Sequence, residues 1–338
     1  MRTRFIALGL SSAALLAACA GGNGDVPVSP SAFGPQTSSV SQALSGGWTS
    51  KASMQTAEFG PGSVEIRDVL YVVGGTSNGC CVYQNVVQAY DIATNTWSTK
   101  APMPTPRNFL AVGSLNGILY AVGGFGQAGA LNTVEAYDPQ KNTWTAKAPM
   151  PTARAELSVR AINGTLYAVG GYALSGNRRT DNQTLVALDV VEAYNPATNT
   201  WTTKSHMNGA HAGAASAQSG TLYIVGGIDA QNNYSHVVEA YDPATDTWAL
   251  KAPMPTARYD LAAGIINGTL YAVGGWGSAG VTNVVEAYNP GTNTWTAKPP
   301  MPTARYGLTV RGIDRQLYAV AGRDSSQLTL STVESYSP

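Results

Sequence analysis

Aromatic and charged residues follow a repeated Gly-Gly pair, and these residues are the best suited in the sequence to bind a ligand. The position directly after the pair differs in each of six repeats, where it holds Thr76, Phe125, Tyr172, Ile228, Trp276 and Arg323. The segments leading into the preceding strands add Phe109, Glu156, Tyr259, Asp260 and Tyr306. Aromatic rings with a few charges suit a sugar, a peptide or a protein surface. We predict an exposed ligand-binding ring; the alternative is that these residues pack on one another.

The first residues are typical of an export signal that ends at a cysteine. Two arginines precede an apolar run that ends at Ala18 and is too short to span a bilayer comfortably. Residues 16–19, Leu-Ala-Ala-Cys, resemble the bacterial lipobox, in which the cysteine is lipidated after cleavage. We predict a lipoprotein signal peptide over 1–18 and a lipid anchor on Cys19, and Ala20 favours the outer membrane or cell surface. Ordinary cleavage beside an incidental cysteine is the alternative.

Composition and charge narrow the class of protein. The 338 residues include 20 basic and 20 acidic side chains, so the sequence lacks the positive field that nucleic-acid binding needs. Only 12% of residues are charged, while 37 glycines and 17 tyrosines favour turns and strands over helices. The segment after Cys19 is rich in Gly, Ser and Pro, which predicts a flexible tether over 19–47. We expect an all-β domain that starts near Trp48 and does not bind nucleic acid.

One unit of sequence recurs six times from residue 48 onward. A Gly-Gly pair ends an apolar strand in five repeats, Ala321-Gly322 takes its place in the sixth, and most spacings are 47 to 49 residues. Each pair follows a segment such as LYAVGG and precedes one such as VEAY, and both have the length and composition of strands. A turn with Pro or Asn and then a Trp complete the unit. The order and period indicate four strands in each repeat.

These elements resemble the Kelch repeat, and the resemblance implies a β-propeller. The last repeat stops at VESYSP, before its Trp strand, whereas Trp48 stands alone in front of the first complete repeat. We therefore predict a six-bladed Kelch-type β-propeller over 48–338, with four strands per blade. The N-terminal Trp48 strand joins the last blade, which closes the ring and removes exposed strand edges.

Repetition separates scaffold residues from variable ones. Tyrosines recur at two places in each repeat and Trp at one, as expected of residues that pack between blades. Four repeats share an Arg and a Glu, which are Arg107, Arg154, Arg258 and Arg305 with Glu135, Glu192, Glu286 and Glu334. In the first repeat Glu58 and Gln88 stand at these two positions, and this paired exchange predicts that the two positions are in contact. We expect structural Arg–Glu bridges.

The resemblance also implies where a partner binds. In eukaryotic Kelch adaptors the positions just after the Gly-Gly pair contact ligand, which carries over to Phe125, Tyr172, Trp276 and Arg323. These positions lie in segments that differ between repeats, whereas the turns expected on the opposite face are short and nearly identical. We predict a membrane-tethered, extracytoplasmic binding or adhesion module that is not an enzyme. Its variable-loop face would bind a protein or carbohydrate ligand.

A sugar mutarotase or epimerase is the alternative. The six-bladed periplasmic sialate mutarotases resemble this chain in blade number and expected location, and Glu156 and Asp260 would then act as acid and base beside an arginine that holds a carboxylate. Relatives of the galactose oxidase type use copper, but His206, His211 and His236 show no ligand spacing. We therefore expect no metal and no cofactor.

Cys80 and Cys81 are adjacent in the variable segment of the first repeat. With Cys19 lipidated and the compartment oxidising, they have no other partner within the chain, so we predict a vicinal disulfide. Two free thiols or an intermolecular bridge are the alternatives, because adjacency makes the ring geometry demanding. Mass spectrometry of the alkylated, unreduced mature protein should find neither thiol modified. Alkylation of both would contradict the prediction.

Overall fold

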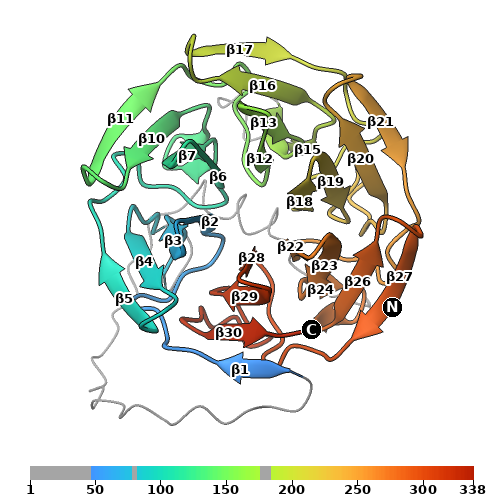
Figure 1. Cartoon of the computed structure of the whole chain (residues 1–338). Helices are drawn as coiled ribbons and strands as arrows, with labels where there is room; N and C mark the ends of the chain where they lie inside the picture. The colour runs from blue at the N-terminus through green and yellow to red at the C-terminus, as the bar shows by residue number, and fades with distance from the viewer. Residues whose placement is uncertain (1–46, 78–81, 176–183) are drawn as a thin grey trace, which may run out of the picture.

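The strands form a ring of six sheets around a central channel (Figure 1). The computed structural model describes residues 47–77, 82–175 and 184–338. Each sheet holds four antiparallel strands, with the first strand of its repeat next to the channel and the fourth at the rim. We number these sheets as blades 1 to 6 in chain order. The predicted all-β, six-bladed architecture with four strands per blade is confirmed.

Blades 1 to 3 contain the first half of the described chain. Blade 1 consists of β2 (Gly62–Ile66), β3 (Val69–Val73), β4 (Val87–Asp91) and β5 (Thr96–Thr99). Blade 2 consists of β6 (Ala111–Leu115), β7 (Ile118–Val122), β10 (Val134–Asp138) and β11 (Thr143–Lys147). Blade 3 consists of β12 (Ser158–Ile162), β13 (Thr165–Val169), β16 (Val191–Asn195) and β17 (Thr200–Thr203).

Blades 4 to 6 complete the ring. Blade 4 consists of β18 (Ala215–Ser219), β19 (Thr221–Val225), β20 (Val238–Asp242) and β21 (Thr247–Leu250). Blade 5 consists of β22 (Ala262–Ile266), β23 (Thr269–Val273), β26 (Val285–Asn289) and β27 (Thr294–Lys298). Blade 6 consists of β28 (Thr309–Ile313), β29 (Gln316–Val320), β30 (Val333–Tyr336) and β1 (Trp48–Ser50).

Two kinds of connection give the ring two different faces. Tight turns join the first and second strands, and in blade 2 Asn116 and Gly117 occupy the turn with φ of 54° and 75°. Positive φ at both residues suits the twist of a type I′ hairpin. The longer second-to-third connections carry three short hairpins, β8–β9 (Phe125–Gly126, Gly129–Ala130), β14–β15 (Tyr172–Ser175, Thr184–Ala187) and β24–β25 (Trp276–Gly277, Gly280–Val281). The described residues include no helix long and apolar enough to cross a membrane.

Aromatic side chains fill the space inside and between the blades. In every blade a Tyr of the third strand packs on a Trp of the fourth, with ring centroids 5.0–5.2 Å apart, as for Tyr137 and Trp144. Across every junction a second-strand Tyr meets the third-strand Tyr of the next blade at 5.5–6.1 Å, as for Tyr71 and Tyr137. The indole N–H of Trp144 donates to the Ala101 carbonyl at 2.9 Å, which satisfies its polar edge. The repeated aromatics are packing residues, as predicted.

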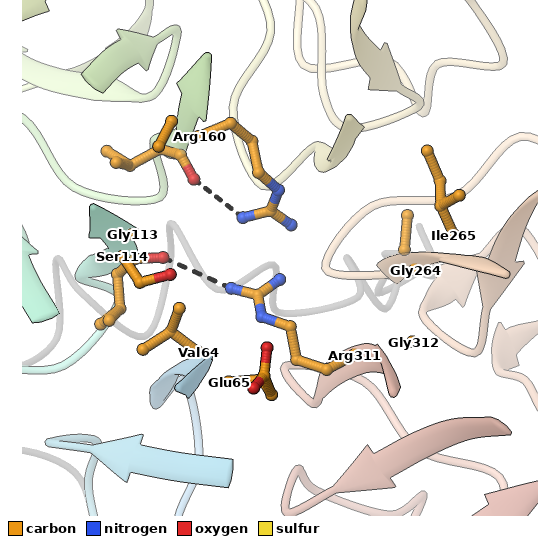
Figure 2. Close-up of a pocket in the computed structure, with 13 residues that line it drawn as sticks. Val64, Glu65, Gly113, Ser114, Arg160, Gly264, Ile265, Arg311 and Gly312 are labelled. Carbon is orange, nitrogen blue, oxygen red and sulfur yellow. Dashed lines mark hydrogen bonds between the residues drawn. The ribbon is translucent and has the colours of Figure 1, made fainter. Parts of the chain in front are cut away.

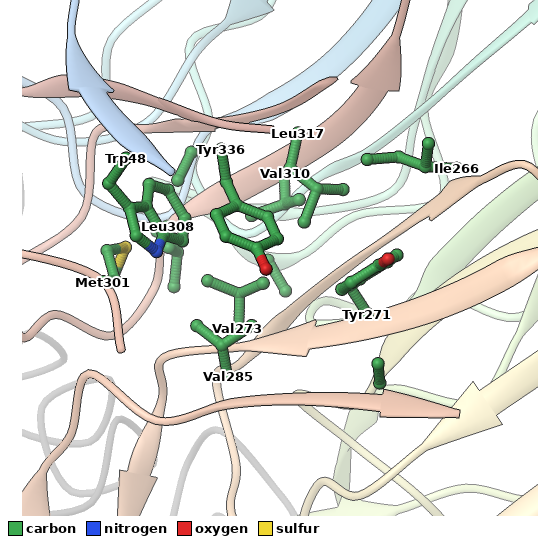
Figure 3. Close-up of a cluster of buried hydrophobic side chains, with 13 residues drawn as sticks. Trp48, Ile266, Tyr271, Val273, Val285, Met301, Leu308, Val310, Leu317 and Tyr336 are labelled. Atoms are coloured by element: carbon green, nitrogen blue, oxygen red, sulfur yellow. The ribbon is translucent and has the colours of Figure 1, made fainter. Parts of the chain in front are cut away.

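The N-terminal strand closes the ring as expected. Strand β1 pairs with β30 and places Trp48 opposite Tyr336. Trp48 is buried, and its indole N–H donates to the Pro299 carbonyl at 3.0 Å. Figure 3 shows Trp48 and Tyr336 in one apolar cluster with Val273 and Val285 of blade 5. The first strand of the domain therefore holds blade 6 together and packs it on blade 5.

Removal of the Trp48 side chain should destabilise the whole propeller. We expect Trp48→Ala to lower the free energy of unfolding by about 3–5 kcal/mol, because a buried indole is replaced by a cavity. Urea denaturation measures this change. Ser50→Ala on the same strand is the matched control, since Ser50 is exposed, and should have little effect. Equal stability of Trp48→Ala and the wild type would contradict the closure.

Candidate functional site

Six backbone hydrogen bonds encircle one mouth of the central channel. They join residues that start the inner strands, one from each blade: Gly60, Phe109, Glu156, Gly213, Asp260 and Gly307. Each N–H donates to the carbonyl of the preceding member at 2.8–3.1 Å, and Gly60 donates to Gly307 to complete the circle. All six have φ between 49° and 65°, a region that glycine enters without cost and other residues enter rarely. We call these six residues the mouth ring.

Two carboxyl groups of the mouth ring converge over a glycine. Gly213 lies between Glu156 and Asp260, and a Cβ at Gly213 would lie 2.8 Å from Asp260 Oδ1 and 3.2 Å from Glu156 Oε2. Both side chains are buried. Burial raises the pKa of Glu156 well above its usual range, and the charge of Asp260 raises it further. Two carboxyl groups held this close disfavour ionisation of both together, which is one property of an acid–base pair.

The residues beside the mouth ring form an aromatic layer under the variable loops. In each blade the residue before the mouth ring bridges to the residue after the Gly-Gly position, as in Tyr259 with Trp276 and Tyr306 with Arg323. Trp276 packs edge-on against Tyr306, and Phe59 packs edge-on against both Phe109 and Tyr306, with ring centroids 5.0–5.2 Å apart. These contacts give the loops a second core of their own.

The candidate ligand-binding residues are the four implied by the Kelch resemblance and the five strand-entry residues, and the exposure expected for these nine is wrong for eight. Phe109, Phe125, Tyr172, Arg323, Glu156, Tyr259, Asp260 and Tyr306 are all buried, and Trp276 alone is partly exposed. The physical reason is the bridge in each blade, which draws the two ring positions together beneath the loops. The side chains lie together, as predicted, but mostly against one another. Their role in ligand binding stays a prediction.

Arg323 is a charged member of the candidate ligand-binding residues, and its side chain makes contacts within the protein. Its guanidinium carbon lies 4.2 Å from the centroid of the Phe59 ring, a cation–π contact. Nη2 also donates to Thr329 Oγ1 at 3.3 Å. Arg323 therefore stabilises the junction of blades 6 and 1.

The repeated Arg and Glu residues form buried ion pairs in four blades. The shortest nitrogen–oxygen distances are 2.9 Å for Arg107–Glu135, 2.9 Å for Arg154–Glu192, 2.6 Å for Arg258–Glu286 and 3.0 Å for Arg305–Glu334. Burial lowers the pKa of Arg107 to about 10 while the charge of Glu135 opposes the shift, so the guanidinium stays protonated at neutral pH. The predicted Arg–Glu bridges are confirmed.

Each ion pair also links two blades. The Arg107 carbonyl accepts the Gly75 N–H of blade 1 at 3.0 Å, whereas its side chain pairs with Glu135 of blade 2. Gly74 is required at this approach, because it has a φ of 63° and a Cβ would lie 2.5 Å from the Arg107 carbonyl oxygen. The Gly-Gly signature and the Arg–Glu signature are parts of one junction.

Two blades depart from this arrangement. In blade 4, His211 replaces the arginine and its Nε2 lies 3.2 Å from Glu239 Oε1, so the position keeps a structural partner. In blade 1 no hydrogen bond joins Glu58 and Gln88 among the described residues, and the contact of their side chains stays a prediction. The Gln88 amide oxygen accepts the N–H groups of Gln55 and Thr56 at 2.9 and 3.1 Å, while both Glu58 carboxyl oxygens are buried without a hydrogen bond from the described residues. Burial raises the pKa of Glu58 from 4.5 to about 8.

Three exposed apolar side chains lie in three different variable loops. The described part of the chain exposes four large hydrophobic residues, and three of them, Val82, Val186 and Leu328, are 51%, 40% and 56% exposed. Each lies in the connection between the second and third strands of its blade, on the variable-loop face. The fourth, Leu250, is 66% exposed at the end of rim strand β21.

Several predicted features lie outside the described residues. They are the signal peptide over 1–18, the lipidated Cys19, most of the tether over 19–47, and the Cys80–Cys81 pair. Among residues 47–77, 82–175 and 184–338, no group of three or more His, Cys, Asp or Glu side chains could hold a metal ion. Lipidation, the disulfide and the absence of a metal stay predictions.

The sequence interpretation missed two arginines of the channel wall. Arg160 on β12 and Arg311 on β28 occupy the same strand position in opposite blades and project into the channel (Figure 2). Alignment of the inner strands would have shown them, because the other four blades carry Val, Gly or Ala there.

The ring of four-stranded blades defines the protein as a six-bladed β-propeller. A family model described as the KLHDC2/KLHL20/DRC7 Kelch-repeats domain matches residues 49–209 and 161–337. The two matches together span nearly the whole ring, and the chain belongs to the Kelch-repeat family.

Similar proteins agree with this assignment over parts of the chain. Kelch-like ECH-associated protein 1B of Danio rerio is 37% identical over 82 residues, which cover 24% of this chain and 14% of that protein. Kelch-like protein 13 of Homo sapiens is 37% identical over 89 residues, which cover 25% of this chain and 14% of that protein. A solved structure described as "Structure of YjhT" has a TM-score of 0.72 at 17% identity and covers 83% of this chain and 95% of its own. That structural similarity shows the shared fold.

Two buried acidic residues at different junctions, Glu58 at the arginine position and Glu135 at the glutamate position, should respond to substitution in opposite directions. Folded Glu58 binds a proton that the unfolded chain releases between pH 4.5 and about 8, so the free energy of unfolding falls as pH rises through this window. Glu58→Gln removes this loss, and we expect stability at pH 8.5 to rise by about 2–4 kcal/mol. Denaturation at several pH values measures the change.

The matched variant is Glu135→Gln, which leaves the Arg107 charge buried without its carboxylate. We expect it to destabilise the protein by about 3–5 kcal/mol. If Glu58→Gln also destabilises the protein at pH 8.5, the assignment of Glu58 as an uncompensated buried acid is wrong.

Proposed function

We propose that this Kelch propeller is a membrane-tethered, extracytoplasmic binding module whose variable-loop face binds a protein partner. The observation that carries the proposal is the placement of Val82, Val186 and Leu328. All three residues lie in loops of the same face, in blades 1, 3 and 6, and protein interfaces have apolar centres. Proteins of the Kelch-propeller family commonly bind protein partners, which supports the same assignment.

The scaffold beneath the loops suits this role. The aromatic layer and the mouth ring hold the loop ends in fixed positions, so a partner would meet a largely preorganised surface. Partly exposed Trp276 reaches this surface from the aromatic layer and is our candidate for an anchor residue, because Trp often contributes most at interfaces. The other eight predicted ring residues would act through the loops they support.

A sugar mutarotase has less support from the geometry. Its proposed acid and base, Glu156 and Asp260, do converge, but the cavity they line at the channel mouth holds only about 100 Å³. Pockets for small organic ligands commonly enclose about 300–1,000 Å³. The size favours a partner on the loop surface over a sugar inside the mouth.

Replacement of the exposed loop residues should weaken partner binding without loss of the fold. We expect the double variant Val82→Ser/Leu328→Ser to retain about one tenth or less of the wild-type protein captured by crosslinking from a cell-envelope extract. Leu250→Ser is the matched control, because Leu250 is at least as exposed but lies on the rim. Equal losses in both variants would contradict a binding role of this face. Binding on a glycan array without a captured protein would instead assign a carbohydrate ligand.

The proposed tether has its own test. Cys19→Ala should abolish lipid attachment and move the protein from the membrane fraction to the soluble fraction, because the lipid provides the membrane affinity. Metabolic labelling with a fatty acid and cell fractionation measure both effects. Wild-type protein without label would contradict the lipid anchor while leaving the loop-face proposal standing.

A further inference from the structure

Two guanidinium groups face one another inside the central channel (Figure 2). Arg160 extends from inner strand β12 of blade 3, and Arg311 extends from inner strand β28 of blade 6, on the opposite side of the ring. They belong to the part of the channel next to the short turns, away from the mouth ring. This region is distinct from the variable-loop face.

The register of the inner strands shows that the two arginines are equivalent. Arg160 pairs with Tyr167 of the second strand and Arg311 pairs with Tyr318, and in each repeat this position pairs with the same recurring Tyr. The corresponding residues of the other four blades are Val64, Gly113, Ala217 and Gly264. Small and apolar residues around the ring leave room for two long cationic side chains.

The two guanidinium groups are held in matching ways. Arg160 Nη1 donates to the Val159 carbonyl and Arg311 Nη1 donates to the Val310 carbonyl, at 2.8 and 3.4 Å. Nη2 of each arginine reaches the inner strand of the next blade, where Arg160 donates to the Ser216 carbonyl and Arg311 to the Ser63 carbonyl. Arg311 Nη2 also donates to the Val112 carbonyl at 3.3 Å. Each guanidinium has five N–H donors, so both retain donors that the described residues do not engage.

Neither positive charge is neutralised by the described residues. Four buried arginines elsewhere in the propeller pair with a glutamate within 3.0 Å, whereas no ion pair of the half-buried Arg160 or Arg311 occurs among the described residues. Glu65 lines the same cavity, but its Oε1 accepts the Asp68 N–H at 2.9 Å and it pairs with neither arginine. Burial lowers the pKa of Arg160 well below its usual range and the nearby Arg311 lowers it further, which expresses the cost of two enclosed like charges.

The guanidinium groups border a cavity of about 200 Å³ lined by residues of five blades. We propose that this channel site binds a small oxyanion with two negative charges, of which inorganic phosphate is the simplest form. Two guanidinium forks approaching from opposite sides supply both the charge and the N–H donors that such an anion needs. The anion would play the part that a glutamate plays beside the four paired arginines. Its negative charge would offset the repulsion between Arg160 and Arg311.

Phosphate titration of the full mature protein tests the site. Isothermal titration calorimetry is performed at constant ionic strength, with sodium chloride in place of phosphate as the reference, because general screening would otherwise resemble binding. We expect one phosphate per chain. Arg160→Gln and Arg311→Gln should each weaken binding by about 10- to 100-fold, since each removes charge-assisted hydrogen bonds. Lys141→Gln, which removes an exposed positive charge at the rim, should bind phosphate as the wild type does.

Circular dichroism and thermal melting confirm that each variant is folded before its affinity is interpreted. Phosphate should raise the melting temperature of the wild type and of Lys141→Gln but not of the two channel variants. Absence of phosphate binding by the wild type, or equal binding by the folded Arg160→Gln and Arg311→Gln variants, would overturn the proposal. The partner-capture result on the variable-loop face does not depend on either outcome.

Discussion

The structure depends on the circle of backbone hydrogen bonds at the mouth of the central channel. Each blade donates one N–H to the carbonyl of the preceding blade, and the Gly60–Gly307 contact joins the first blade to the last. Such a circle exists only when all six blades are present at their correct angles. The left-handed backbone of the mouth ring bends every chain segment into its inner strand, and three of the six positions use glycine because it tolerates this conformation best. The mouth ring closes the propeller at the axis, and the pairing of β1 with β30 closes it at the rim.

Contacts between blades recur at successive distances from the axis. The Arg–Glu junctions and the Tyr–Tyr contacts lie outside the mouth ring, and the indole hydrogen bonds lie at the rim. Because all these kinds of contact occur at the same blade junctions, a change that separates two blades weakens several of them together. Two junctions differ. At the junction of blades 3 and 4 His211 replaces the arginine, and at the junction of blades 6 and 1 Glu58 replaces it while Arg323 stacks on Phe59. At this junction the cation, Arg323, therefore lies in the loops and not in the sheet.

The fold could be predicted from the sequence because the residues that determine it recur in the repeats. The spacing of the Gly-Gly pairs gave the number of blades, the unpaired Trp48 gave the closure, and the matched Arg and Glu positions gave the ion pairs. Exposure was not predictable in the same way. Alignment places Phe125 and Tyr172 at one position in their repeats, but their burial depends on the neighbouring loops, which differ from blade to blade. The hydrogen bonds of Gln88 were not predictable either, because its amide oxygen accepts from the backbone N–H groups of Gln55 and Thr56.

The four arginines paired with glutamate and the two arginines of the channel differ in the free-energy cost of holding their charge. A buried guanidinium opposite a glutamate recovers much of its desolvation cost through the pair, and its removal leaves a carboxylate without a partner. Arg160 and Arg311 recover only what carbonyl dipoles provide, and each raises the cost of the other. Their strand position accepts glycine in two other blades, so the fold itself does not require a long side chain there. A charge that the scaffold does not need and does not neutralise is best explained by a ligand of opposite charge, which makes the channel a second functional region independent of the loops.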